Sequence, residues 1–343
     1  MMPAPVRAAF QAQSKACAGL GSPFMASLMH LCATRDWPQS GVTDRLRLWE
    51  GDLGPRAQSV PLRISGALHA LVLKGHPDLG AVYPPHPVDA DRLWAAICVA
   101  LVEEAAFVDA FIDNPPQTNE VRRSAALIAV GHFLAERYDL PIRTSELGAS
   151  GGLNLHWDSY ALKAAGQLRG PDNPVLTLSP DWHGLALPIV PPRVVSRGGV
   201  DISPLDPSRD SDALRLQAYL WPDQPDRLAL THAAIGAATT RVDEGCAIGW
   251  LTPRLPHQSG TLHLVYSTIA WQYFSPGKQA EGAAAIAEAG ARATDDTPLA
   301  WFGMEQDDAG PGAALTLRLS PDAITLDLGR ADFHGRWFDW RPL

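Results

Sequence analysis

The chain has 343 residues, of which 46% are hydrophobic and 19% are charged, a balance typical of folded globular proteins rather than disordered ones. This length allows two domains, or one large domain with an extension. The formal net charge of -9 disfavours a nucleic-acid duplex as a bulk partner, because phosphate backbones attract basic surfaces.

The cysteines and the apolar runs indicate the compartment. No two of the four cysteines are close enough in sequence for a metal knuckle or a redox pair, and we expect them to be buried in a reducing environment: Cys17, Cys32, Cys98 and Cys246. No clustered His, Asp and Glu pattern predicts a metal site. Without a signal-peptide pattern or an apolar run of about 18 residues, the sequence predicts a cytoplasmic protein with no membrane span.

The first 138 residues predict an all-helical N-terminal domain. Apolar residues recur at helical spacing, and the expected helices cover residues 6–20, 24–34, 62–73, 93–112 and 120–138. Gly21 and Pro23 end the first helix, and Asn119 suits the N-cap of the last one.

After Pro141 the pattern changes to strands that alternate with helices. The expected strands cover residues 142–147, 194–202, 247–251, 262–269 and 299–304, and the expected helices cover 153–165, 213–237 and 279–293. This alternation predicts an α/β domain over residues 139–343 with a mostly parallel, Rossmann-like sheet. Residues 314–319 and 324–328 predict an antiparallel C-terminal hairpin, and residues 166–192 an irregular insertion rich in Pro and Gly.

A glycine-rich turn follows the first expected strand. The sequence runs from Glu146 through Gly148-Ala149-Ser150-Gly151-Gly152 to Asn154. Glycines let the chain turn sharply and let a ligand approach the backbone, and the start of the next helix favours anions or polar groups. The spacing differs from the dinucleotide fingerprint G-x-G-x-x-G. A carboxylate two residues before the first glycine suits a cationic cofactor instead.

This turn resembles the first motif of class I S-adenosylmethionine-dependent methyltransferases, in which an acidic residue precedes three alternating glycines. Glu146, Gly148, Ser150 and Gly152 match by position, with Ser150 in place of the central glycine. The resemblance implies that this stretch, as far as Asn154, binds S-adenosylmethionine, with Glu146 meeting its amino group. It also implies that Asp201 binds the ribose, and that Asp243, with Glu244 as the second candidate, lies near the adenine.

The catalytic residue is not predicted by these motifs. Methyl transfer mainly needs alignment of a nucleophile with the sulfonium, so the chemistry requires no dedicated general base. The fourth strand leads to Tyr266 and Ser267, where such methyltransferases place groups that face the substrate. His334, whose imidazole titrates near neutral pH, is the third candidate.

A second resemblance extends from about residue 20 to the end of the chain. Four segments are similar to an uncharacterised bacterial family known as domain of unknown function 2332: residues 117–123, 146–154, 199–201 and 333–337. The family's usual His-Ser pair after the fourth strand is Tyr266-Ser267 here. The resemblance implies a methyltransferase-like fold with a helical N-terminal extension, and no established substrate.

The segment from Gln117 to Arg123 allows two interpretations. It could form a polar lid, with Gln117, Asn119, Arg122 and Arg123 over the cofactor or an acidic substrate. It could instead be structural, with Asn119 as a helix cap and the arginines solvated or bridged to Glu146.

The leading hypothesis is therefore an S-adenosylmethionine-binding, methyltransferase-like protein that acts on an unknown small molecule. One alternative is a serine hydrolase, because Gly148 to Gly152 also spells G-x-S-x-G, with Ser150 as nucleophile, Asp307 or Asp308 as the acid and His334 as the base. The other alternative is a non-catalytic sensor or interaction protein on the same fold. The oligomeric state is not predicted.

Overall fold

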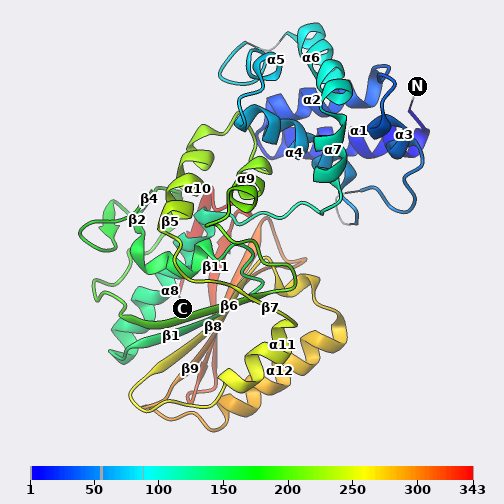
Figure 1. The fold of residues 1–343 in the computed structure, drawn as a ribbon. Coiled ribbons are helices and arrows are strands. Elements are labelled where there is room, and N and C mark those ends of the chain that lie inside the picture. Colours follow the sequence, from blue (N-terminus) through cyan, green and yellow to red (C-terminus); the bar gives the residue numbers. More distant parts are fainter. Residues whose placement is uncertain (1, 55–56, 88, 343) are drawn as a thin grey trace. The chain divides into compact units, whose positions relative to one another are not determined.

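The computed structural model describes residues 2–54, 57–87 and 89–342 (Figure 1). They form two compact units. The helical unit comprises residues 1–118 and 210–229, and the sheet unit comprises residues 119–209 and 230–343. This division differs from the predicted boundary at residue 138, since the helix that ends there packs in the core of the sheet unit.

The helical unit is built around α4 (Val60–Leu73), whose side chains are buried on nearly all sides. The other helices of this unit are α1 (Ala4–Gly19), α2 (Pro23–Thr34), α3 (Gly41–Arg47), α5 (Pro77–Gly80), α6 (Ala90–Glu103), α7 (Ala105–Ile112) and α9 (Asp210–Ala218). Apolar faces from these helices share one core, as expected for amphipathic helices that pack on one another.

Two contacts explain why residues 210–229 belong to the helical unit. The carboxylate of Asp223 accepts hydrogen bonds from the Ser22 hydroxyl at 2.6 Å and the Phe24 amide at 3.0 Å, at the start of α2. On α4, a Cβ at Gly66 would lie 2.5 Å from the Tyr219 ring, so only glycine allows this approach.

The helix boundaries differ from the sequence prediction at three places. The expected helix 93–112 is two helices, because the backbone at Glu104 leaves the helical region (φ -103°, ψ 21°). The expected helix 120–138 begins as a 3-10 turn, Val121–Arg123, before α8 (Ser124–Tyr138). The expected helix 213–237 is α9 followed by α10 (Pro225–Ala237), which starts at a proline and crosses from the helical unit into the sheet unit.

The sheet unit contains one large sheet with the strand order β5-β12-β11-β10-β9-β8-β1-β6-β7. Its strands are β1 (Ile142–Leu147), β5 (Asp181–Gly184), β6 (Val194–Asp201), β7 (Asp243–Glu244), β8 (Leu262–Thr268), β9 (Leu299–Gln306), β10 (Ala313–Ser320), β11 (Ile324–Ala331) and β12 (Trp337–Trp340). Strands β7, β6, β1, β8 and β9 are parallel neighbours, and β10 to β12 run antiparallel. The prediction of an α/β protein with a mostly parallel sheet and a helical N-terminal region is confirmed.

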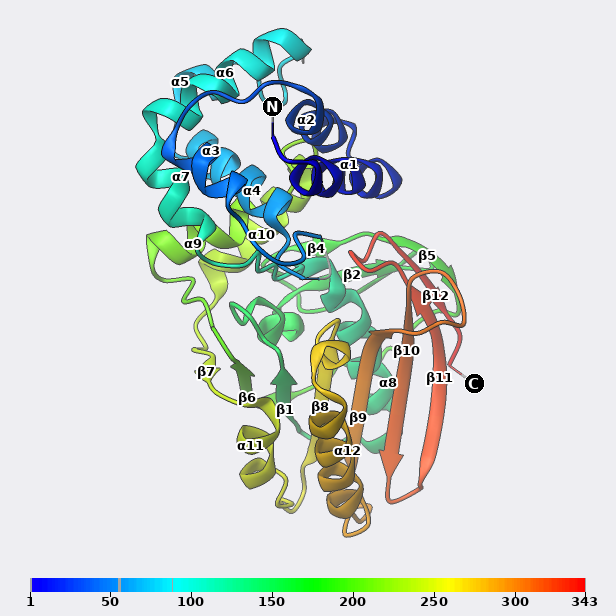
Figure 2. The same ribbon diagram turned by 90° about the vertical axis from the view of Figure 1, so that its right-hand side faces the viewer.

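Helices cover both faces of the parallel strands, with α8 on one face and α11 (Ala247–Leu251) and α12 (Pro276–Gly290) on the other (Figure 2). Strand alternation divides β1 between these faces. Ile142 shares the core of α8, while Leu147 packs with α11 and α12. The central strand β8 is buried throughout, including its polar residues His263, Ser267 and Thr268.

Three further predictions in the sheet unit need correction. Residues 247–251 form helix α11 and no strand, and the third parallel strand is the two-residue β7, which precedes it. Residues 153–165 are not one helix: a 3-10 helix, η2 (Leu153–Ser159), is followed by β2 (Ala161–Ala164). The insertion forms β3 (Gln167–Arg169) and β4 (Thr177–Leu178) beside β2, and supplies β5 to the edge of the large sheet.

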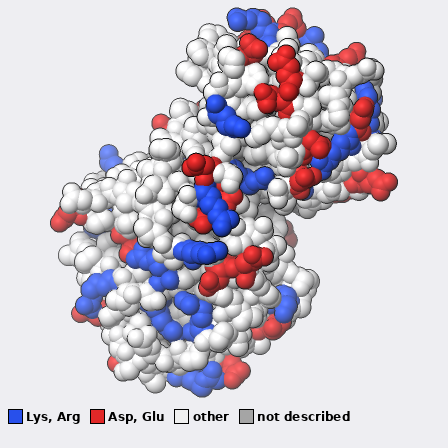
Figure 3. Space-filling view, in the orientation of Figure 1, with Lys and Arg blue, Asp and Glu red and all other residues white. Residues whose placement is uncertain are grey.

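Acidic and basic side chains are interspersed on the visible face of each unit (Figure 3), which fits an acidic chain without a strong charge separation. Within the described ranges, no helix is both long enough and apolar enough to span a bilayer.

Candidate functional site

The order of the parallel strands places the candidate site. From β1 the chain continues to β6 and β7 on one side, and to β8 and β9 on the other. Ligands of open α/β sheets bind at the carboxyl ends of the strands where the order reverses in this way. Here that point lies between β1 and β8, at Glu146 of β1 and its register partner Tyr266 of β8.

Glu146 is a buried carboxylate with little compensation from the protein. Only 1% of the Glu146 surface is exposed to solvent. Within the described part of the chain it accepts one hydrogen bond, from the Tyr266 hydroxyl at 3.4 Å. Burial raises the pKa of Glu146 well above its usual range, and the nearby Asp201 raises it further, while Tyr266 and Arg123 oppose this.

The turn after Glu146 depends on three left-handed residues, Gly148 (φ 78°), Ser150 (φ 53°) and Gly152 (φ 72°). A Cβ at Gly148 would lie 2.5 Å from the Cβ of Ala270, and one at Gly152 would lie 2.8 Å from Val242. Both glycines are therefore required by backbone conformation and by space. Ser150 adopts the same left-handed conformation although it has a side chain, so its backbone is strained.

Asp201, at the end of β6, binds the same turn. Its carboxylate accepts hydrogen bonds from the Ser150 amide at 2.9 Å and the Ser203 amide at 3.0 Å. The structure thus brings Glu146, Ser150 and Asp201 together, and the role of Asp201 at a ribose remains a prediction. These bonds leave Asp201 lone pairs for a further donor.

The third parallel strand presents two exposed carboxylates. Asp243 and Glu244 are the register partners of Val200 and Asp201. The indole nitrogen of Trp250 donates to Asp243 at 2.7 Å. Their position beside the end of β6 is compatible with the predicted role near an adenine, which remains a prediction.

The predicted lid segment is anchored to the turn by buried hydrogen bonds. Asn119 accepts one from the Leu153 amide at 2.9 Å, at the start of η2. The side-chain amide of Asn154 accepts a hydrogen bond from the Ser124 hydroxyl at 2.7 Å and donates one to the Glu120 carbonyl at 3.3 Å. Asn119 is therefore a cap of η2 rather than of its own helix, and Asn154 holds the segment in place.

The two arginines of this segment differ in what they contact. Arg123 donates to the Thr268 carbonyl at 3.0 Å and the Phe333 carbonyl at 2.9 Å, so it joins the end of β8 to the turn after β11. Arg122 forms an ion pair with the buried Glu120 at 3.2 Å. Because Gly335 has no Cβ, the His334 turn packs directly against the Arg122 backbone.

Gln117 lies in the helical unit, where it is half-buried, and the other three lid candidates lie in the sheet unit. Its predicted role in a lid remains a prediction.

The three catalytic candidates have different surroundings. Tyr266 is completely buried, and its hydroxyl also reaches the Asn154 carbonyl at 3.2 Å. Ser267 is buried and donates to Glu305 at 2.8 Å. His334 is half-buried and thus the candidate that solvent reaches.

The hydrolase interpretation lacks a base in contact with the nucleophile. The Ser150 hydroxyl is buried and has no hydrogen-bond partner among the described residues. Asp307, one of the proposed acids, is held by Arg330 at 2.6 Å. A nucleophilic serine needs a neighbouring base within hydrogen-bond reach.

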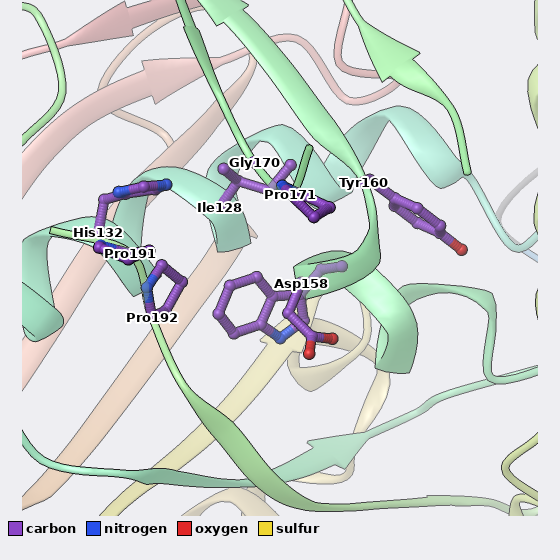
Figure 4. Close-up of a pocket in the computed structure, with 9 residues that line it drawn as sticks. Ile128, His132, Asp158, Tyr160, Gly170, Pro171, Pro191 and Pro192 are labelled. Carbon is purple, nitrogen blue, oxygen red and sulfur yellow. The ribbon is translucent and has the colours of Figure 1, made fainter. Parts of the chain in front are cut away.

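A separate cavity of about 140 Å³ lies between α8 and η2 (Figure 4). Ile128, His132, Asp158 and Pro192 are among its lining residues. Small-molecule pockets usually measure roughly 300–1,000 Å³. This cavity is therefore too small for a nucleoside cofactor, and Glu146 does not line it.

Sequence reasoning missed several residues that shape the site. Glu305, at the end of β9, accepts the Ser267 hydroxyl and the amides of Ala270 and Trp271, which fixes the loop packed against Gly148. A carboxylate at a strand end was a usable signal. Ser124 carries no comparable local signal, because its hydrogen-bond partner Asn154 is 30 residues away in the sequence.

No group of three or more His, Cys, Asp or Glu residues that could hold a metal ion is found in the described parts of the chain. A comparison with curated proteins found no match. A family profile described as "uncharacterized protein conserved in bacteria" matches residues 7–340, nearly the whole chain. The chain therefore belongs to this bacterial family, DUF2332.

Proposed function

We propose that the sheet unit binds S-adenosylmethionine at the carboxyl ends of β1, β6 and β7 and acts as a methyltransferase on a small molecule. The observation that carries this proposal is Glu146, a carboxylate that is 1% exposed and accepts a single long hydrogen bond from the described residues. An ionised carboxylate has about four acceptor positions. Its burial is costly unless a ligand supplies donors or positive charge.

The cofactor matches this demand in charge. Its amino group and its sulfonium are cationic, and an opposite charge beside a buried carboxylate favours the ionised form. Asp201 and Glu244 add negative charge at the neighbouring strand ends. The residues present therefore fit the cofactor's positive end, with Glu146 opposite the amino group.

The backbone of the turn supports the same assignment. Gly148 and Gly152, both with positive φ, form the tight turn that directly follows Glu146 at the end of β1. The order of the parallel strands, together with the antiparallel strands that end the sheet, resembles a methyltransferase-like fold. That resemblance is an analogy of fold, and the argument for function rests on Glu146.

Methyl transfer would draw its methyl group from the cofactor's sulfonium. The part left to this chain is orientation and exclusion of water. The Tyr266 hydroxyl contacts both Glu146 and the Asn154 carbonyl. Arg123 joins the His334 turn to the end of β8. His334, half-buried, is the candidate that would meet a substrate.

Calorimetric titration of the full chain with S-adenosylmethionine tests the proposal. We expect binding by the wild type and at least a tenfold loss in Glu146→Gln. The control Glu281→Gln removes an equivalent charge from the surface ion pair with Lys278 and should bind normally. Folded protein that binds neither S-adenosylmethionine nor S-adenosylhomocysteine would overturn the proposal, and binding without methylation of any offered small molecule would favour a sensor.

The serine hydrolase remains a second candidate because of the positive φ of Ser150, a strained conformation typical of a nucleophile elbow. Labelling with a fluorophosphonate probe tests it. Labelling that disappears in Ser150→Ala would establish this alternative. We expect no labelling, because no base contacts the hydroxyl within the described residues.

A further inference from the structure

A second polar cluster lies on the face of the sheet opposite to Glu146. Strand alternation directs Arg143 and Ser145 of β1 away from the α8 face, and His263 is the register partner of Arg143 on β8. The Arg143 guanidinium contacts Nδ1 of His263 at 3.1 Å, and Nε2 of His263 contacts the Ser145 hydroxyl at 2.9 Å. Arg254, from the turn after α11, donates to the same hydroxyl at 3.2 Å.

The direction of these hydrogen bonds follows from their donors. A guanidinium only donates, so Nδ1 of His263 accepts, and the neutral ring carries its proton on Nε2. Ser145 Oγ then accepts from both His263 and Arg254. Its own hydrogen finds no acceptor among the described residues, although Ser145 is completely buried.

No carboxylate of the described residues is bonded to the cluster, although Asp243 is near enough to raise the pKa of Arg254 against the larger, opposite effect of burial. Neither Arg143 nor Arg254 forms an ion pair with a carboxylate of the described chain, and Nε of Arg143 is buried without a hydrogen-bond partner. Burial, and then Arg254, lower the pKa of Arg143. Burial and these two arginines hold the pKa of His263 well below its usual range, with a smaller effect of His257. Both guanidinium groups are therefore positively charged without a bonded carboxylate, and guanidinium is the side-chain group best suited to phosphate recognition.

The surrounding chain holds the arginines in these positions. Arg254 stacks on the Trp250 ring at 4.4 Å, and a Cβ at Gly198 would lie 2.7 Å from its guanidinium. Arg143 also donates to the Pro256 carbonyl at 2.6 Å. Two guanidinium groups are thus fixed before any ligand arrives, which reduces the entropic cost of binding.

We propose that Arg143, Arg254 and Ser145 form a binding site for a phosphoryl dianion, either free phosphate or the phosphomonoester of a small molecule. Guanidinium groups match phosphate oxygens with paired N–H donors, and the buried Ser145 hydroxyl holds the Arg254 side chain in position. The site lies on the other face of the sheet from Glu146, so it stands whether or not the cofactor proposal holds.

Calorimetric titration of the full chain with inorganic phosphate and with glycerol phosphate, at constant ionic strength, tests this proposal. We expect binding of at least one of them, weakened tenfold or more in Arg143→Gln and in Arg254→Gln. The matched control is Arg318→Gln, since Arg318 also stacks on a tryptophan, Trp301 at 4.5 Å, but lies outside the cluster. Binding of inorganic phosphate identifies free phosphate as sufficient, while binding of the ester alone points to a phosphorylated metabolite.

A second measurement guards against loss of binding through misfolding. In the wild type, phosphate should shift the nuclear magnetic resonance signals of the His263 ring, because a dianion beside the cluster changes its charge environment. Ser145→Ala should keep the fold and weaken binding by a smaller factor. The proposal is overturned if the folded wild type binds neither probe, or if Arg318→Gln weakens binding as much as Arg254→Gln does.

Discussion

Glu146 and Tyr266 are register partners on the neighbouring parallel strands β1 and β8, and the Tyr266 hydroxyl is 3.4 Å from the Glu146 carboxylate. The two side chains are buried at the point where the strand order reverses. A phenol that also reaches the Asn154 carbonyl compensates a buried carboxylate only partly. The protein therefore bears a local cost in stability at this position, as is common at ligand sites.

Replacement of Glu146 by glutamine should stabilise the free protein near neutral pH by about 1 to 3 kcal/mol, the usual cost of a poorly satisfied buried polar group. The pKa of Glu146 is higher in the folded protein than in the unfolded chain. At a pH above the pKa of the unfolded chain, folding therefore takes up a proton. Stability from this group is therefore complete at low pH and falls as pH rises.

Chemical denaturation of both proteins between pH 4 and pH 8 checks this sign. The difference in unfolding free energy should grow with pH and nearly vanish at pH 4. A destabilised glutamine variant at pH 7 would mean that the carboxylate is satisfied in the free protein.

Cofactor affinity should rise with pH over the same range, provided that a cationic amino group binds Glu146. In the free protein, the raised pKa of Glu146 keeps its carboxyl group protonated. An adjacent positive charge favours the ionised carboxylate, so binding of the cofactor should release this proton. Titration calorimetry in buffers of different ionisation enthalpy measures the number of protons released. An affinity that is independent of pH in the wild type would remove Glu146 from the contact.

Gly148→Ala should destabilise the sheet unit by at least about 1 to 3 kcal/mol, the typical cost of a left-handed conformation in a residue with a side chain. The new Cβ would also lie 2.5 Å from that of Ala270. Gly277→Ala is the matched control, since it lies in α12 with open space around it and should be neutral or slightly stabilising. Thermal melts of both variants measure the contrast, and equal melting temperatures would contradict it.

Local sequence patterns locate the turn at the carboxyl end of β1. The turn from Glu146 to Gly152 is contiguous, and Gly148 and Gly152 within it have positive φ, as expected where glycines let the chain turn sharply. Asp201 lies beside this turn despite the long insertion, because strand order in an α/β sheet brings successive strand ends together.

Contacts between distant segments and short elements were not predictable in the same way. Residues 247–251 are as apolar as a buried strand, and periodicity over five residues does not separate the two states. The hydrogen bonds of Asn119 and Asn154 join segments about 34 residues apart, so no local spacing encodes them. For the same reason, the cluster of Arg143 and Arg254 was not anticipated.

Asn154→Ala should cost about 1 to 3 kcal/mol, because it leaves the buried Ser124 hydroxyl without its acceptor and removes one of the donors to the Glu120 carbonyl, which also accepts from the Arg123 amide. A double-mutant cycle with Ser124→Ala should give a coupling energy of about 0.5 kcal/mol or more, as expected for residues in direct contact. Urea denaturation of the four proteins provides the values. Strict additivity would show that Asn154 acts independently of Ser124.

Acid should weaken the helical unit through His69, whose Nδ1 lies 3.1 Å from the Ala218 carbonyl. Burial lowers the pKa of His69 to about 4, although the hydrogen bonds to the backbone partly oppose it. Below about pH 6.5 His69 is protonated in the unfolded chain but stays neutral in the folded protein. Its contribution to stability is therefore complete above this pH and is lost as the pH decreases toward 4. His69→Asn keeps a side-chain N–H near the position of Nδ1 but does not titrate. The unfolding free energy of this variant, measured with denaturant at pH 7 and at pH 4.5, should therefore change less with pH than that of the wild type, and an equal change would exclude His69 as a source of the acid sensitivity.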